Sequence, residues 1–269
     1  LKRYSFLISL ITIVIWSCSD DFSPDNPLDP ENPEFITPEV SITSGPSSGE
    51  VLSTSVTSFS WEGNKPFMLF KYAFDQEWGS WTDQKTVQLT YLDEGDHNFS
   101  IKSTYTTEAG DTSGHESEVS TIDFKVDAVD GPAIVFYPRR HVASIGDVVN
   151  FKIFAEEVEN LSAVEMDIAY DKRSLTIIEV TQGNILQTAE QTLFHTEIDS
   201  LSGGIHILAG LMGSDSPSFF GTSDILSITV KIKEAGLTYL TFEGKEVFKD
   251  ANNNTISILE AVNGLVEAY

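Results

Sequence analysis

Apolar and polar residues alternate along most of this chain after residue 39, and this period-two pattern constrains the fold more than any other feature. The clearest runs are Phe59 and Trp61, Phe99 and Ile101, and residues 122–126, 151–155, 164–170, 205–211 and 226–232. Successive side chains of a β-strand point to opposite faces, so such runs are typical of strands with one buried and one solvated face. No segment has the period of a long amphipathic helix. The sequence therefore predicts an all-β protein.

Charge and cysteine content narrow the function classes. The 269 residues include 16 Lys and Arg against 41 Asp and Glu, which gives a formal net charge of −25. Such a negative field repels phosphate backbones, so we expect no nucleic-acid partner. Cys18 is the single cysteine, which excludes an internal disulfide and a cysteine-based metal site.

The sequence carries no enzyme signature. The histidines are His97, His115, His141, His195 and His206, and none lies at the spacing of a zinc hydrolase pair. His195 and His206 either face each other across a hairpin or are simply exposed strand residues. A nucleophile elbow, a P-loop and a dinucleotide fingerprint are absent, although 41 acidic residues leave a glycosidase carboxylate pair open. We therefore expect a protein that is not an enzyme.

Turn-forming residues divide the strand pattern into two units. The sequence Asp-Ala-Val-Asp-Gly-Pro at residues 127–132 interrupts the alternation and marks the best boundary. Residues 39–127 have room for roughly seven short strands, the number found in many β-sandwiches. Residues 132–269 carry roughly nine such runs. The sequence predicts two β-sandwich domains in series.

The first residues have the pattern of a secretory signal. Lys2 and Arg3 precede an apolar run over residues 6–16, which is shorter than the roughly 20 residues of a membrane-spanning helix. The run ends in Ile-Trp-Ser-Cys at residues 15–18, which resembles the cleavage box of bacterial lipoproteins. That resemblance implies removal of residues 1–17 and acylation of Cys18. The alternative is an ordinary signal peptide in which Cys18 has no role.

Residues 18–38 form a tether rich in proline and acidic residues. Its five prolines lie among Asp, Glu and Asn, a composition that favours an extended chain. Ser-Asp-Asp at residues 19–21 resembles the acidic surface-export tag of lipoproteins from Bacteroidetes-like bacteria. Together with the cleavage box, this resemblance implies a lipoprotein of the outer membrane that faces the cell exterior.

The first folded unit contains three stretches rich in aromatic residues. They are Phe-Ser-Trp at residues 59–61, Trp-Gly-Ser-Trp at 78–81, and residues 92–99, where a loop leads into a strand that is expected to bury Phe99. These stretches resemble immunoglobulin-like and fibronectin type III-like modules. Trp78 and Trp81 have two interpretations. They are either an exposed pair that stacks on carbohydrate or core residues, and the core assignment is favoured because tryptophan is usually largely buried.

The second unit contains three stretches with a characteristic order and spacing. They are residues 144–151, then residues 164–171 with a Tyr-Asp turn followed by 175–180 and Gly183, and finally residues 225–233, 248–256 with the turn Asp-Ala-Asn-Asn-Asn, and 262–266. Together these stretches resemble the cohesin domain, a nine-stranded jelly roll of cellulosomes and related surface assemblies. The resemblance spans the whole unit. It implies a binding module whose partner is the helical dockerin module.

The strand over residues 163–170 is the candidate partner-binding strand. Its alternation places one set of side chains outward, and these are Ala163, Glu165, Asp167 and Ala169. The resemblance to cohesins places this strand in the dockerin-binding sheet. Glu165 then occupies the place of a frequent acidic contact, and Ala163 stands where the family often has asparagine. The alternative is that Glu165 and Asp167 are simply solvated.

Asp250, Asn252 and Asn254 form a candidate calcium site. They present oxygen-bearing side chains at every second position, and calcium prefers such hard oxygen ligands. Asparagine is equally common in turns that need a left-handed backbone conformation, and the Glu of an EF-hand loop is missing. The turn is therefore the favoured interpretation, and no other cofactor is expected.

These observations favour a lipid-anchored surface protein that binds without catalysis. The cohesin resemblance implies docking of a dockerin-bearing, polysaccharide-degrading enzyme. Because sandwich folds also occur in carbohydrate-binding modules, direct binding of a polysaccharide is a second hypothesis. A passive structural or adhesin role is the third.

Overall fold

The computed structural model describes residues 25–106, 112–213 and 217–269. Within these ranges no helix is both long and apolar enough to cross a membrane. The predicted signal peptide over residues 1–17 and the predicted lipidation site Cys18 lie outside the described residues.

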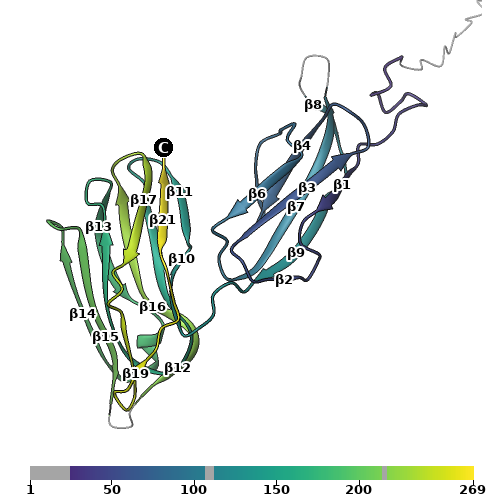
Figure 1. Cartoon of the computed structure of the whole chain (residues 1–269). Coiled ribbons are helices and arrows are strands. Elements are labelled where there is room, and N and C mark those ends of the chain that lie inside the picture. Colours follow the sequence, from purple (N-terminus) through teal and green to yellow (C-terminus); the bar gives the residue numbers. More distant parts are fainter. Residues whose placement is uncertain (1–24, 107–111, 214–216) are drawn as a thin grey trace, which may run out of the picture.

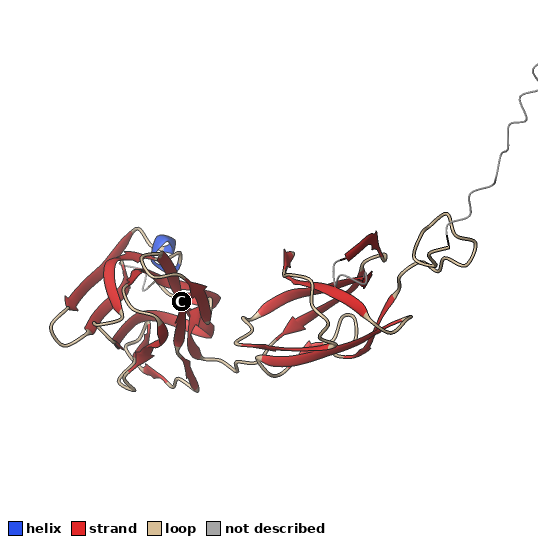
Figure 2. Ribbon diagram, turned by 90° about the horizontal axis from the view of Figure 1, so that it is seen from above, coloured by secondary structure: helices blue, strands red, loops and turns tan. Residues whose placement is uncertain are grey.

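The prediction of two β-sandwiches is confirmed (Figures 1 and 2). Nine strands in the described residues form the first domain, and they are β1 (Val40–Ser44), β2 (Val51–Leu52), β3 (Val56–Gly63), β4 (Met68–Phe74), β5 (Glu77–Trp78), β6 (Thr86–Thr90), β7 (Gly95–Thr106), β8 (Thr112–Glu116) and β9 (Ser120–Val126). The sequence predicts about seven. The additional strands include β2 and β5, which have two residues each and are too short to show alternation.

Two sheets pack face to face in the first domain. One sheet has the order β1-β3-β6, and the other has the order β2-β9-β7-β4-β5 with β8 beside β7. Phe59 of β3 stacks on Phe99 of β7 across the interior, with ring centroids 3.9 Å apart. The predicted burial of Phe99 is confirmed, because this side chain is fully inaccessible to solvent.

Residues 26–35 differ from the predicted extended tether. Asn26, Asp29 and Asn32 each precede a proline, and each side chain accepts a hydrogen bond from the backbone N–H two residues later, at 2.8–3.0 Å. Backbone hydrogen bonds over three residues close the same turns. Leu28 and Phe35 pack against the first-domain core. The expectation of an extended chain is wrong here because Asx side chains satisfy the turn backbone locally.

Twelve strands in the described residues form the second domain. They are β10 (Ala133–Tyr137), β11 (Arg140–Ala143), β12 (Val148–Tyr170), β13 (Leu175–Gln182), β14 (Gln191–Asp199), β15 (Gly204–Met212), β16 (Phe219–Ile232), β17 (Gly236–Phe242), β18 (Val247–Asp250), β19 (Thr255–Ile256), β20 (Glu260–Val262) and β21 (Gly264–Ala268). A short 3₁₀-helix spans Ile185–Thr188. The number exceeds the predicted nine because short segments such as β19 and β20 pair separately. The predicted boundaries at 39–127 and 132–269 stay predictions, with β9 ending and β10 starting close to them.

Strand β12 belongs to both layers of the second sandwich. Its first half pairs with β10 and β16, and its second half pairs with β15, β17 and β18. The register shifts between Ala155 and Leu161, where Glu157 and Asn160 adopt positive φ angles of 49° and 60°. These irregularities let one strand turn from one sheet into the other.

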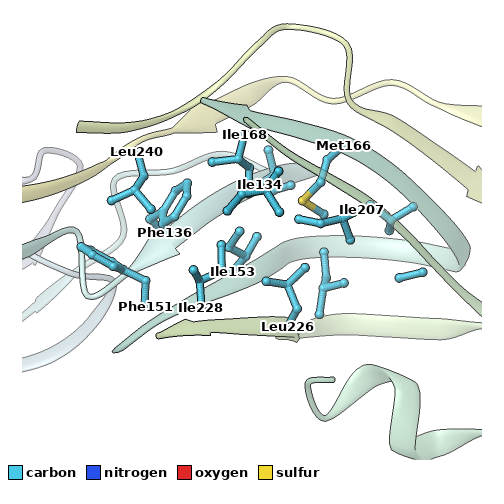
Figure 3. Close-up of a cluster of buried hydrophobic side chains, with 14 of the residues drawn as sticks. Ile134, Phe136, Phe151, Ile153, Met166, Ile168, Ile207, Leu226, Ile228 and Leu240 are labelled. Carbon is cyan, nitrogen blue, oxygen red and sulfur yellow. The ribbon is translucent and has the colours of Figure 1, made fainter. Parts of the chain in front are cut away.

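The second core lies between these layers (Figure 3). Side chains from five strands meet there, and the labelled residues are Ile134, Phe136, Phe151, Ile153, Met166, Ile168, Ile207, Leu226, Ile228 and Leu240. The predicted inward set on β12 is confirmed, because Val164, Met166, Ile168 and Tyr170 are all buried. The opposite side of the same strand segment is therefore left to face outward.

Candidate functional site

One outer face of the second domain gathers the predicted partner-binding residues. It is formed by β14, β15, the second half of β12, and β18, which are hydrogen-bonded neighbours in that order. We call this face the ledge. It consists of Leu193, His195 and Glu197 of β14, His206, Leu208 and Gly210 of β15, Ala163, Glu165 and Asp167 of β12, and Val247 and Lys249 of β18.

The first half of the ledge is flat and partly apolar. Ala163 lies opposite Gly210 on one side and Lys249 on the other. A Cβ atom added at Gly210 would lie 3.5 Å or more from its nearest neighbours, so a larger residue would fit here without a clash. The absence of a side chain therefore leaves this part of the surface flat. Leu193, opposite Gly210, is 47% exposed. Small residues beside an exposed leucine allow another backbone to approach closely.

The second half of the ledge is acidic. It contains a pocket of about 300 Å³ lined by Asp167, Ile168, Glu197, Asp199, Gly204, Ile205, His206 and Glu243. The Asp167 carboxylate lies 2.7 Å from Nδ1 of His206. Glu197 is directly opposite His206 on the neighbouring strand. Four carboxylates and one imidazole thus line the same pocket at this end of the ledge.

Acidic side chains outnumber basic ones around the pocket. Hydrogen bonds from Ser202 and Leu201 lower the pKa of Asp199. The Lys245 ammonium lies 3.1 Å from Glu243 and 3.9 Å from Asp167. Its hydrogen bond to Glu243 and the nearby charges raise the pKa of Lys245, so it stays cationic. One lysine against four carboxylates leaves a site suited to a cationic side chain.

The structure brings the three predicted partner-binding residues together. Ala163, Glu165 and Asp167 lie in adjacent rows of the ledge, with Glu165 exposed and the other two half-buried. Whether they contact a partner stays a prediction. The sequence analysis missed Glu197, Asp199 and Glu243, which reach the pocket from β14 and from the segment after β17. The only earlier signal was the outward position of Asp167, which does not identify its neighbours.

His195 and His206 do not face each other directly, so the alternative of a facing pair across the hairpin is wrong. His195 lies opposite Leu208, and His206 lies opposite Glu197. The two histidines are therefore diagonal neighbours on one face, offset by two residues. The hairpin register, which the sequence pattern does not specify, places a carboxylate rather than a second imidazole across from His206.

The favoured core assignment of Trp78 and Trp81 is wrong. Trp78 on the edge strand β5 is 41% exposed, and Trp81 is half-buried. The Lys102 ammonium lies 5.1 Å and 5.7 Å from the two ring centroids and forms an ion pair with Glu116 at 2.5 Å. Cation–π contact thus accounts for this pair on the surface of the first domain. Carbohydrate stacking by Trp78 and Trp81 stays a prediction.

Asp250, Asn252 and Asn254 form a self-satisfied turn. The Asp250 carboxylate accepts hydrogen bonds from the backbone N–H of Asn252 and Asn254 and from the Asn254 amide, at 2.7–3.0 Å. The pKa of Asp250 is lowered, mainly by the hydrogen bond from the Asn254 side chain. Asn253 has the positive φ of 63° expected for such a turn. Calcium binding here stays a prediction, and the described residues contain no group of three His, Cys, Asp or Glu placed to hold a metal ion.

The second domain matches one known family. A family model described as the cohesin domain matches residues 138–267, which include the whole ledge. No curated protein gives a significant match to the sequence.

Several solved structures are similar to about half of the chain. A non-cellulosomal cohesin from Archaeoglobus fulgidus has 17% identity, covering 51% of this chain and 90% of that chain, with a TM-score of 0.43. The Coh-OlpA-Doc918 complex, a type I cohesin–dockerin complex from Clostridium thermocellum, has 18% identity, 51% and 98% coverage, and a TM-score of 0.45. A type II cohesin from the cellulosome of Acetivibrio cellulolyticus has 16% identity, 50% and 92% coverage, and a TM-score of 0.45.

Proposed function

The second domain of this chain is a cohesin domain, and from this premise we propose that the protein binds a dockerin module through the ledge. The family match over residues 138–267 is the observation that carries the proposal. Two of the similar structures are cohesin–dockerin complexes from Clostridium thermocellum. The protein then acts by binding and not by catalysis.

The surface of the ledge fits a helical partner. Its flat half, around Ala163 and Gly210, allows a helix to lie close to the sheet. Its acidic pocket, around Asp167 and Glu197, accepts a lysine or arginine side chain from that helix. The opposite charges steer association and fix the orientation of the partner.

A calorimetric titration with purified dockerin modules, with and without calcium, tests this proposal. We expect saturable, calcium-dependent binding to at least one dockerin. The double variant Glu165→Lys and Asp167→Lys should lose that binding, because it reverses two charges on the ledge. Glu179→Lys is the matched control, since Glu179 is exposed on β13, away from the ledge. Absence of binding to every dockerin, including those of the same organism, overturns the proposal.

We propose further that Cys18 anchors the protein to the outer membrane as a lipoprotein, with both domains outside the cell. The support is the sequence Ile-Trp-Ser-Cys at residues 15–18, the basic start and the acidic tether that follows. In this arrangement a docked polysaccharide-degrading enzyme is held at the cell surface. Labelling of cells with a palmitate analogue should mark the protein, and Cys18→Ser should abolish the label. An equal label on both forms contradicts the anchor without affecting the docking proposal.

A further inference from the structure

A short segment connects the two domains (Figure 1). Residues 127–132 lead from β9 to β10. Ala128 packs against the core of the first domain. The next residue, Val129, is 4% exposed and packs with Ala133 and Val135 of the second domain. Adjacent residues therefore pack against different domains.

One loop of the first domain contacts both the connecting segment and the second domain. Asp93 and Glu94 lie in the loop between β6 and β7. One Glu94 carboxylate oxygen pairs with the Arg139 guanidinium at 2.5 Å, and the other accepts a hydrogen bond from the Ala128 backbone N–H at 2.9 Å. The Asp93 carboxylate accepts a hydrogen bond from the Arg139 backbone N–H at 2.6 Å.

This contact is largely shielded from solvent. The side chain of Arg139 is 6% exposed and that of Glu94 is 18% exposed. Separation of the domains would break the ion pair and the backbone hydrogen bonds of the same loop, and water would have to solvate both charges again. Tyr91, from the same loop, interacts with Tyr239 on β17 and raises the pKa of that side chain.

His97 of the first domain contacts the Asp93–Glu94 loop from the interior side. Its Nδ1 lies 2.8 Å from the Asp75 carboxylate, and its Nε2 lies 2.8 Å from the Asp93 carbonyl oxygen. The imidazole thus links the Asp75 carboxylate to the backbone of the loop. The side chain is 8% exposed and packs beside Phe74 and Phe124.

We propose that the Asp93–Glu94 loop locks the two domains into one rigid body, so that the ledge points in a fixed direction relative to the N-terminal tether. The lock consists of the two carboxylates, the Ala128 and Arg139 backbone groups, and the Arg139 guanidinium. The proposal does not depend on what the ledge binds. A surface module held rigidly presents its binding face without the entropy loss of ordering a hinge on binding.

Distance measurements between spin labels on the full chain test the lock. Labels at Glu62→Cys and Glu179→Cys, in a Cys18→Ser background, report one position in each domain, and both sites are exposed. We expect a single narrow distance distribution for the otherwise unchanged protein. Glu94→Ala should broaden that distribution about twofold or more, because it removes the contacts to Arg139 and Ala128. Glu118→Ala is the matched control and should leave it narrow.

The distance distribution of the doubly labelled protein with Glu94 in place tests the proposal by itself. A broad distribution with Glu94 in place shows that the domains move independently and overturns the proposal, whatever the variants do. A narrow distribution that stays narrow in Glu94→Ala also overturns the role of the loop. Circular dichroism of each variant confirms that the sandwiches remain folded, so that broadening reports domain motion.

Discussion

Replacing Ala163 with arginine is expected to reduce dockerin binding about 100-fold, or about 2.7 kcal/mol. Ala163 is half-buried at the centre of the flat half of the ledge, between Gly210 and Lys249. A long cationic side chain at this position stands above the surface and holds the partner helix away. It also places a second positive charge beside Lys249. Calorimetric titration against a dockerin that binds the unaltered protein measures the loss.

Thr176→Arg provides the control for this prediction. Thr176 is exposed on β13, outside the ledge, so the same side chain there should leave affinity unchanged. Both variants should unfold at the temperature of the parent protein, because neither position is in a core. Full affinity in Ala163→Arg would place the docking surface elsewhere on the domain, even if dockerin binding itself were established.

The orientation of the ledge residues could be predicted because it is a local property of one strand. Alternation over residues 163–170 assigns Met166 and Ile168 to the interior and Glu165 to the surface, and a shift by one residue would reverse every side chain. The burial of Phe99 follows from the same reasoning. In both cases the neighbouring residues of one strand are enough to assign each side chain to the interior or to the surface.

The acidic pocket could not be predicted because it depends on pairing between distant strands. Asp167 and His206 are 39 residues apart, and their 2.7 Å contact follows from the register of β12 with β15. Glu197 joins them through the separate register of β14 with β15. Alternation assigns a face to each residue, but it does not assign the residue opposite. The sequence therefore predicts that Asp167 faces outward, but it does not predict which residues form the pocket around it.

The predictions of core tryptophans and of an extended proline-rich tether were wrong for a related reason. Burial statistics favour tryptophan in a core, but Trp78 lies on an edge strand where Lys102 covers its ring face. Composition favours an extended tether, but the Asx-Pro repeat at Asn26 and Asp29 closes successive turns. In each case a specific side-chain contact outweighs an average tendency.

Phe151→Ala is expected to lower the free energy of unfolding of the second domain by about 3–5 kcal/mol. The Phe151 side chain is fully buried on β12, where its ring makes edge contacts with Phe136 at 5.6 Å and with His141 at 4.6 Å between centroids. Truncation removes these contacts and leaves a cavity between the two sheets. Urea denaturation, followed by circular dichroism, measures the change.

Val148→Ala on the same strand separates this effect from a general sensitivity of β12. Val148 is 55% exposed, so its truncation should change the free energy of unfolding by less than about 0.5 kcal/mol. Since β12 contributes to both sheets, loss of packing at Phe151 should loosen the ledge as well as the opposite layer. Equal denaturation midpoints for Phe151→Ala and Val148→Ala would contradict a core built around this strand. A selective loss in Phe151→Ala, accompanied by weaker docking, would show that the ledge depends on the packing behind it.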